Sequence, residues 1–121
     1  MVGVGVGSAV LVLVLHAQAA GLAPSWPEQL SSAHSHNDQE QAEPLALALA
    51  AGFASVEADV WWRGGRIAVS HSPFGDKGSL DDLYLKPLQA RVDRLGSVHG
   101  DGRPFWLWVD LKRRHQQLQL R

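Results

Sequence analysis

The sequence predicts an α/β fold, and three observations support this prediction. Two strongly apolar segments, 53–62 and 105–111, are rich in Val and Trp, which favours strands over helices. A short segment with the start and stop residues of a helix precedes the first of these strands. A longer region of helical spacing separates the two. Alternation of this kind is typical of a βα-type barrel or of an open sheet with parallel strands.

Composition excludes several classes of protein. The chain has 121 residues, of which 45% are hydrophobic, so a globular core is expected. Its formal net charge of -1 offers no extended basic surface, which argues against nucleic acid as a partner. It contains no cysteine, which excludes disulfides, thiolate metal sites and a cysteine nucleophile.

The first 20 residues are predicted to form a signal peptide. Residues 1–15 are apolar and uncharged, and small residues follow, so cleavage is expected after Ala19 or Ala20. The apolar stretch is shorter than the roughly 20 residues that a membrane span needs. An uncleaved anchor is the alternative. We therefore expect a secreted or extracytoplasmic protein, with a linker over 21–31 and one domain over 32–121.

Polar residues, prolines and glycines predict the limits of the remaining elements. Polar residues over 32–38 indicate a loop. A helix is expected from Glu43, with Pro44 at its first position and Gly52 as its left-handed stop. Its apolar face consists of Leu45, Ala48 and Leu49.

The strand over 53–62 is expected to turn at Gly64 and Gly65 and to return as a hairpin over 66–70. Beyond it, Ser79 and Asp82 resemble a capping box. Helical spacing then continues to Gly96, and Pro87 is expected to split this region into two short helices.

Acidic residues lie where the two apolar segments end. Glu57 and Asp59 are two apart in a strand, so both carboxylates leave the same face. An unpartnered buried carboxylate is costly, so either this strand end meets water or a cation lies between the acids. Asp110 ends the second apolar strand, and parallel pairing would bring it to the same rim. Oxygen ligands of this kind suit Mg²⁺ or Ca²⁺. A solvated edge strand is the alternative.

Two histidines are candidates for proton transfer, because imidazole titrates near neutral pH. They are His34, in the polar loop, and His71, at the end of the hairpin. A strict two-residue turn would point His71 away from the acids, so we predict an added residue, a glycine bulge, in the hairpin. His36 competes with His34, since His-x-His is also a zinc-hydrolase spacing.

Lys112 shares a face with Asp110 and can contact a phosphate oxygen as a compact cation. A solvated lysine at a strand end is the alternative. Asn37 and Asp38 can serve simply to shape their loop.

Five motifs in this order resemble the altered inheritance of mitochondria protein 6 family. They are His34-Ser35-His36-Asn37-Asp38, Val56-Glu57-Ala58-Asp59-Val60-Trp61, Val69-Ser70-His71, Leu83-Tyr84-Leu85-Lys86-Pro87-Leu88 and Val109-Asp110-Leu111-Lys112. That family is similar to glycerophosphodiester phosphodiesterases, to spider-venom sphingomyelinase D and to phosphatidylinositol-specific phospholipase C. The resemblance covers about residues 31–112.

The resemblance implies a PLC-like TIM barrel with one divalent ion, Mg²⁺ or alternatively Ca²⁺. The implied ion ligands are Glu57, Asp59 and Asp110, and the implied acid and base pair is His34 and His71. The implied substrate contacts are Lys112, His36 and Asn37.

The implied activity is that of a metal-dependent phosphoric diester hydrolase acting on a lipid- or glycerol-type phosphodiester, with peripheral membrane contact. A zinc hydrolase using His34 and His36, and an inactive phosphodiester-binding fragment, are the alternatives. A complete barrel takes about 250 residues, so we expect an incomplete TIM-type (β/α) barrel, the amino-terminal portion only. Open strand edges should then favour self-association.

Overall fold

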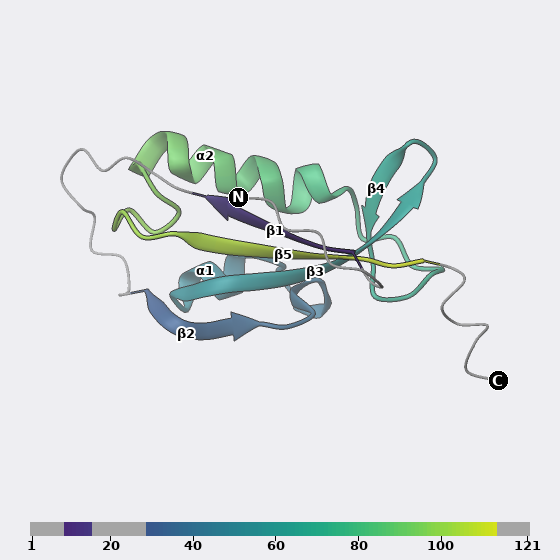
Figure 1. Cartoon of the computed structure of the whole chain (residues 1–121), viewed down its shortest axis with the longest axis horizontal. Helices are drawn as coiled ribbons and strands as arrows, with labels where there is room; N and C mark the ends of the chain where they lie inside the picture. The colour runs from purple at the N-terminus through teal and green to yellow at the C-terminus, as the bar shows by residue number, and fades with distance from the viewer. Residues whose placement is uncertain (1–8, 16–28, 114–121) are drawn as a thin grey trace.

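A computed structural model of the protein describes residues 9–15 and 29–113, and it confirms the α/β class (Figure 1). The strands are β1 (Ala9–Leu15), β2 (Leu30–Ser35), β3 (Phe53–Arg63), β4 (Arg66–Val69) and β5 (Phe105–Leu111). The helices are the 3₁₀ turn η1 (Asp38–Glu40), α1 (Ala46–Ala50), the π-helical turn η2 (Asp81–Leu85) and α2 (Lys86–Leu95).

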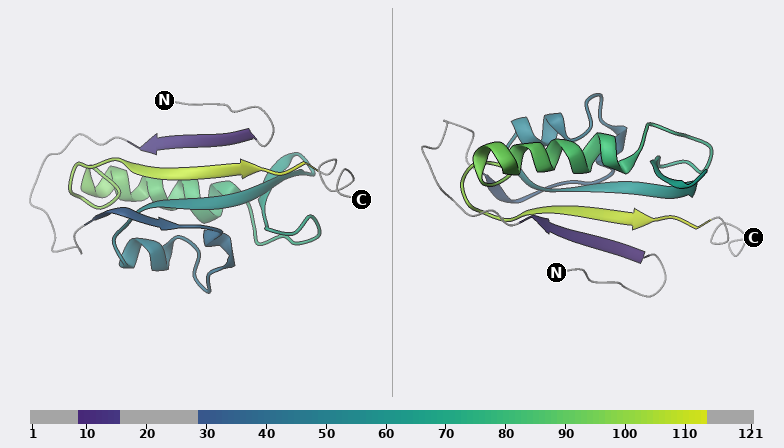
Figure 2. Two further views of the ribbon diagram at one scale, coloured as in Figure 1. Left: turned by 60° about the horizontal axis from the view of Figure 1, so that its bottom comes forward. Right: turned by 90° about the horizontal axis from the view of Figure 1, so that it is seen from above.

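The strands form one open sheet in the order β1-β5-β3-β2, with β4 paired to β3. Strands β2, β3 and β5 run parallel, whereas β1 is antiparallel to β5 and β4 is antiparallel to β3. Both α1 and α2 lie on the same side of this sheet (Figure 2). The described residues thus have one face of the sheet covered by helices, and they do not show a closed barrel.

The hydrophobic core lies between that face and the helices. In β3 and β5 every second residue points into it, and these side chains are 0–4% exposed: Val56, Ala58, Val60, Phe105, Leu107 and Val109. Leu49 of α1 and Leu88 of α2 pack against them. Each Val, Leu or Phe side chain of this kind contributes about 1.5–3 kcal/mol when fully buried. The alternation leaves the odd positions of β3 and the even positions of β5 on the opposite face.

The predicted helices are present with changed limits. Helix α1 begins at Ala46 rather than Glu43, because Leu45 before it adopts a positive φ of 64°. Pro87 does not separate two helices. It lies in the first turn of α2, where a missing N–H leaves no hydrogen bond unmade, and η2 leads directly into that helix.

The hairpin has no bulge, so that prediction is wrong. Arg63 pairs with Arg66 across Gly64 and Gly65, whose φ angles of 53° and 80° suit a two-residue turn. Two glycines adopt this conformation without strain, so the hairpin needs no added residue. The strict register extends to Ser70, whose N–H donates to the Asp59 carbonyl over 3.0 Å.

The leader is described only in part. Residues 9–15 form β1, which pairs with β5 from Ala9 opposite Leu111 to Leu15 opposite Phe105. The expected cleavage positions, and the linker up to residue 28, lie outside the described residues, so export stays a prediction. Strand β2 already begins at Leu30, within the expected linker. Among the described residues no helix has the length and apolar character needed to cross a bilayer.

A buried carboxylate fixes the loop between β2 and α1. Asp38 is fully buried and accepts hydrogen bonds from Ser35 Oγ (2.7 Å), the Leu45 N–H (2.6 Å) and the Tyr84 hydroxyl (2.8 Å). The bond to Leu45 holds the strained backbone that precedes α1. Burial, together with the charge and hydrogen bond of Asp38, raises the pKa of Tyr84 above its ordinary value of 10.0.

This network predicts a loss of stability at alkaline pH. Tyr84 is the single tyrosine, and above about pH 10 it ionises in the unfolded chain while the folded chain keeps it protonated. The free energy of unfolding should therefore fall as pH rises beyond that value. Tyr84→Phe should lower stability at neutral pH by about 1–3 kcal/mol and flatten the alkaline fall. Urea unfolding of both proteins across this range measures the effect, and equal alkaline slopes would contradict it.

Candidate metal centre

Three carboxylates meet at the carboxyl ends of β3 and β5. Asp59 of β3 is directly opposite Asp110 of β5, and Glu57 lies two residues earlier on the same face of β3. We call Glu57, Asp59 and Asp110 the carboxylate trio. Each offers an oxygen, and these atoms all lie within 4.8 Å of one another. In-register parallel pairing therefore gathers the three acids on the face that the helices leave open.

Two oxygens of the trio lack a hydrogen-bond partner among the described residues. They are Asp59 Oδ1 and Asp110 Oδ1, and both atoms are buried. An unsatisfied buried acceptor costs about 1–3 kcal/mol, and more when it is charged. A cation would remove this cost. An all-carboxylate oxygen set suits Mg²⁺ or Ca²⁺ better than zinc, so the residues present fit such an ion.

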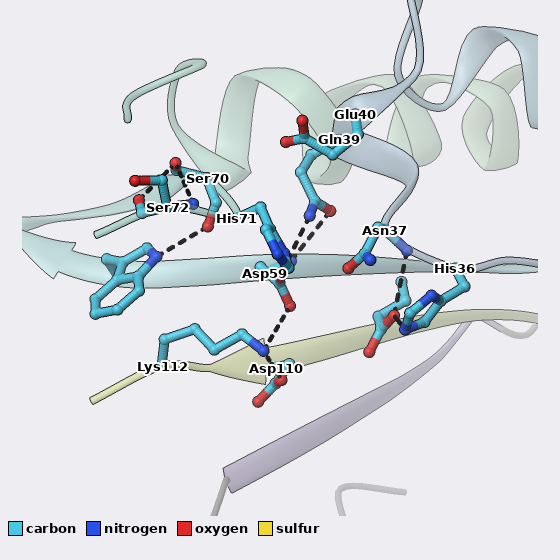
Figure 3. A network of polar contacts seen from close by, with 12 residues as sticks. His36, Asn37, Gln39, Glu40, Asp59, Ser70, His71, Ser72, Asp110 and Lys112 are labelled. Carbon is cyan, nitrogen blue, oxygen red and sulfur yellow. Dashed lines mark hydrogen bonds and ion pairs between the residues drawn. The ribbon is translucent and has the colours of Figure 1, made fainter. Parts of the chain in front are cut away.

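Lys112 lies against the trio (Figure 3). Its Nζ donates to Asp110 Oδ2 and lies 3.1 Å from Asp59 Oδ1, within ion-pair distance but without hydrogen-bond geometry. Burial alone would lower the pKa of Lys112. The hydrogen bond to Asp110 and the ion pair with Asp59 outweigh that effect and keep this pKa above its usual range. The lysine therefore stays cationic and offsets part of the trio's charge.

His71 reaches the trio by another route than the predicted bulge. Strand β4 ends at Val69, and the chain turns after Ser70, whose carbonyl accepts a hydrogen bond from Trp61 Nε1 (2.9 Å). This turn places His71 Nδ1 2.7 Å from Asp59 Oδ2. Its side chain remains 59% exposed while Asp59 is 1% exposed. The His71 ring therefore contacts the buried Asp59 carboxylate on one side and solvent on the other.

His36, rather than His34, contacts the trio. His36 Nε2 lies 3.0 Å from Glu57 Oε2. His34 instead places Nδ1 2.8 Å from Ser55 Oγ. The difference follows from the end of β2 at Ser35, because His34 is still a strand residue and His36 belongs to the loop beyond it. His34, Ser55, Glu57 and Trp108 line an open hollow of about 530 Å³.

Two loop residues complete the surroundings. Asn37, predicted as a substrate contact, has a φ of 49° and donates its backbone N–H to Glu57 Oε2 over 3.2 Å. Gln39, which sequence reasoning missed, is fully buried. Its Oε1 accepts from the Asp59 N–H (3.2 Å), and its Nε2 donates to Asp59 Oδ2 (3.3 Å). A single glutamine in a polar stretch gives no sequence signal for such a role.

Within the described ranges, the structure places no group of three metal ligands around His34 and His36. Within the described part of the chain, the trio is the group of at least three His, Cys, Asp or Glu side chains whose ligand atoms all lie within 4.8 Å of one another. Neither histidine belongs to it. The His-x-His alternative thus finds no third ligand in residues 29–113.

Comparison with known proteins matches this chain to one family. The model of the AIM6-like phosphodiesterase domain matches residues 29–101, which include Glu57, Asp59 and His71. No solved structure matches.

Curated relatives carry the same family name. Altered inheritance of mitochondria protein 6 from Eremothecium gossypii is 44% identical over 89 residues, which cover 67% of this chain and 22% of that protein. The protein of that name from Kluyveromyces lactis is 40% identical over 76 residues, 59% of this chain and 17% of its own length. The homolog from Arthroderma benhamiae is 31% identical over 101 residues, 65% of this chain and 32% of that protein.

The chain therefore spans between 17% and 32% of these three relatives. The family model, in contrast, covers more than half of the chain and extends from the start of β2 to the loop before β5. It takes in the loop of His36 and Gln39, the acidic strand β3 and the turn of His71. The chain belongs to the AIM6-like phosphodiesterase domain family.

Proposed function

We propose that this chain carries the ion-binding part of a metal-dependent phosphoric diester hydrolase that acts on a lipid- or glycerol-type phosphodiester. The observation that carries the proposal is the carboxylate trio, with two buried oxygens that lack a hydrogen-bond partner among the described residues. Membership of a phosphodiesterase family supports the reaction class. Mg²⁺ is the proposed ion, with Ca²⁺ as the alternative.

The ion and the lysine would act on the charge of the phosphoryl group. When bound, a divalent cation polarises a phosphoryl oxygen and offsets the negative charge that develops on it. Glu57, Asp59 and Asp110 would hold it. Lys112 would provide a second positive charge to a phosphate oxygen, because its Nζ lies at the edge of the trio and remains protonated.

Proton transfer falls to the histidines on the two flanks of the trio. His71 uses Nδ1 to contact Asp59, which leaves Nε2 to exchange a proton with the substrate. On the other flank, His36 contacts Glu57. We assign His36 the role that the family resemblance implied for His34, because His36 lies beside the acids and His34 contacts Ser55. Figure 3 shows His36 and His71 at separate positions along β3.

We also propose that residues 29–113 form the start of a PLC-like barrel. Parallel strands β2, β3 and β5 with helices on one face agree with a barrel wall, in which active sites lie at the carboxyl ends of strands. The open face exposes Trp106 (37%) and Trp108 (39%), which further strands would cover. The relatives are several times longer than the matched region. The apolar leader and the small residues that follow it, Ala17 to Ala20, support export of the protein.

Removal of a trio carboxylate should abolish ion-dependent turnover. We expect Asp110→Asn to lower Mg²⁺-dependent hydrolysis of bis(para-nitrophenyl) phosphate on the order of 100-fold, because loss of several kcal/mol of charge stabilisation corresponds to that factor. Chelation of the ion from the wild-type protein should have the same effect. Asp93→Asn is the matched control, since Asp93 is exposed on α2. Mg²⁺ binding without any wild-type turnover would instead favour a phosphodiester-binding module.

The two candidate bases can be separated by single substitutions. His36→Ala should lower kcat on the order of 100-fold, as should His71→Ala, because each loses a positioned proton-transfer group. His34→Ala should retain the wild-type rate within a few-fold, since its ring contacts Ser55. Steady-state kinetics with the same substrate gives the comparison. A large loss in His34→Ala together with an active His36→Ala would reverse the assignment.

A further inference from the structure

We infer that Gln39 sets the ion preference of the trio, because it restricts Asp59 to one-oxygen coordination and thereby favours Mg²⁺ over Ca²⁺. The inference rests on the proposed function of the trio as a divalent-cation site. Gln39 touches neither the ion position nor the substrate in this assignment. It acts through Asp59 and is therefore a positioning residue.

Gln39 accepts the backbone hydrogen bond of Asp59 that a neighbouring strand would otherwise accept. Strand β2 pairs with β3 only as far as Ser35 opposite Val56, and β4 begins its pairing at Val60. The backbone N–H of Asp59 falls in the gap between these two partners and donates to Gln39 Oε1 over 3.2 Å. A fully buried amide thus fills this gap along β3, and η1, which begins at the anchored Asp38, carries it there.

The other end of the same amide fixes the Asp59 side chain. Gln39 Nε2 donates to Asp59 Oδ2 over 3.3 Å, and His71 Nδ1 lies 2.7 Å from that same oxygen. Asp59 Oδ1 is left without a hydrogen bond among the described residues, although Lys112 Nζ lies near it. Because Asp59 is 1% exposed and Gln39 and His71 hold Oδ2, Oδ1 is the oxygen of Asp59 that a cation would reach, in exchange for its ion pair with Lys112.

The other two carboxylates follow the same pattern. The Asn37 N–H and His36 both contact Glu57 through one oxygen, Oε2. Lys112 donates to Asp110 Oδ2, whereas Asp110 Oδ1 has no hydrogen bond within the described residues. Glu57 and Asp110 thus each have one oxygen engaged by the described residues, whereas Asp59 has Oδ2 held by hydrogen bonds and Oδ1 in an ion pair with Lys112.

Single-oxygen coordination discriminates between the two hard cations. Mg²⁺ demands near-ideal octahedral geometry with short bonds, whereas Ca²⁺ takes more oxygens and accepts bidentate carboxylates. A trio held to one oxygen each therefore suits Mg²⁺. Of the donors that impose this limit, Gln39 is the one that is both neutral and fully buried, so its replacement leaves the charge of the site unchanged.

The test is a comparison of Mg²⁺ and Ca²⁺ affinity in the whole chain by isothermal titration calorimetry. Gln39→Met keeps the length of the side chain and removes both hydrogen bonds. We expect Mg²⁺ to bind about 10–100-fold more weakly, the usual effect of losing an outer-shell partner. Ca²⁺ affinity should change less, because a freed Oδ2 can join its coordination. The ratio of Mg²⁺ to Ca²⁺ affinity should therefore fall, by about 10–100-fold if Ca²⁺ affinity is unchanged and by less if it also declines.

Gln29→Met is the matched control. Gln29 is also buried, at 5% exposure, and its Nε2 donates to the Pro104 carbonyl over 3.0 Å at the opposite end of the sheet. Its loss should leave both affinities unchanged. If Gln39→Met fails to fold by circular dichroism, Gln39→Asn retains the amide but is too short to make both bonds. It should shift the ratio in the same direction by a smaller factor.

The outcomes separate the two proposals. Equal loss of Mg²⁺ and Ca²⁺ affinity in Gln39→Met, or a wild-type preference for Ca²⁺, would overturn the role of Gln39 while the ion site stands. A wild-type chain that binds neither ion would overturn the ion site and this inference with it.

Discussion

Parallel pairing of β3 with β5 is the constraint on which the candidate centre depends. It sets Asp59 opposite Asp110, and the two-residue period of a strand then adds Glu57 to the same face. Three like charges this close repel one another unless cations or donors surround them. Among the described residues, the trio carboxylates are contacted by donors and ion-pair partners: the Asn37 N–H, Gln39 Nε2, His36, His71 and Lys112. The strand register thus decides both where the charge lies and what must be built around it.

The donors come from loops that are themselves held by buried polar contacts. Asp38 anchors the loop of His36 and Gln39 through three hydrogen bonds, one of which restrains the positive-φ backbone at Leu45. On the other side, Arg63 donates to the carbonyls of Pro73 and Gly75 and holds the segment that follows His71. Rigid supports of this kind are what a site of defined geometry requires.

Local periodicity was sufficient to predict the strand part of the centre. The spacing of Glu57 and Asp59, and the position of Asp110 at a strand end, predicted that the acids share a face and a rim, and the structure places them together. The glycines at the helix ends could also be predicted, since Gly52 and Gly96 both adopt a positive φ of 80°. These features depend on chemistry within a few residues along the chain.

Sequence reasoning was insufficient where tertiary contacts decide the outcome. The predicted bulge for His71 was wrong, because the position of His71 depends on the turn after Ser70, whose carbonyl accepts a hydrogen bond from Trp61. Whether His34 or His36 contacts the acids depends on where β2 ends, because His34 is a strand residue and His36 lies in the loop beyond it. The sequence did not predict the role of Gln39, because that role depends on the gap between β2 and β4 along β3. The described residues form an open sheet, so the barrel stays a proposal.

The position of β1 links the leader to the finished molecule. This strand covers the outer edge of β5, the same strand that supplies Asp110. Removal of the first 20 residues would strip that cover and bare a row of backbone groups seven residues long. Before cleavage, the chain would keep β1 paired to this edge of β5. After cleavage, the exposed edge would be open to pairing with another strand. Any strand that next paired with β5 would lie beside the strand that supplies Asp110.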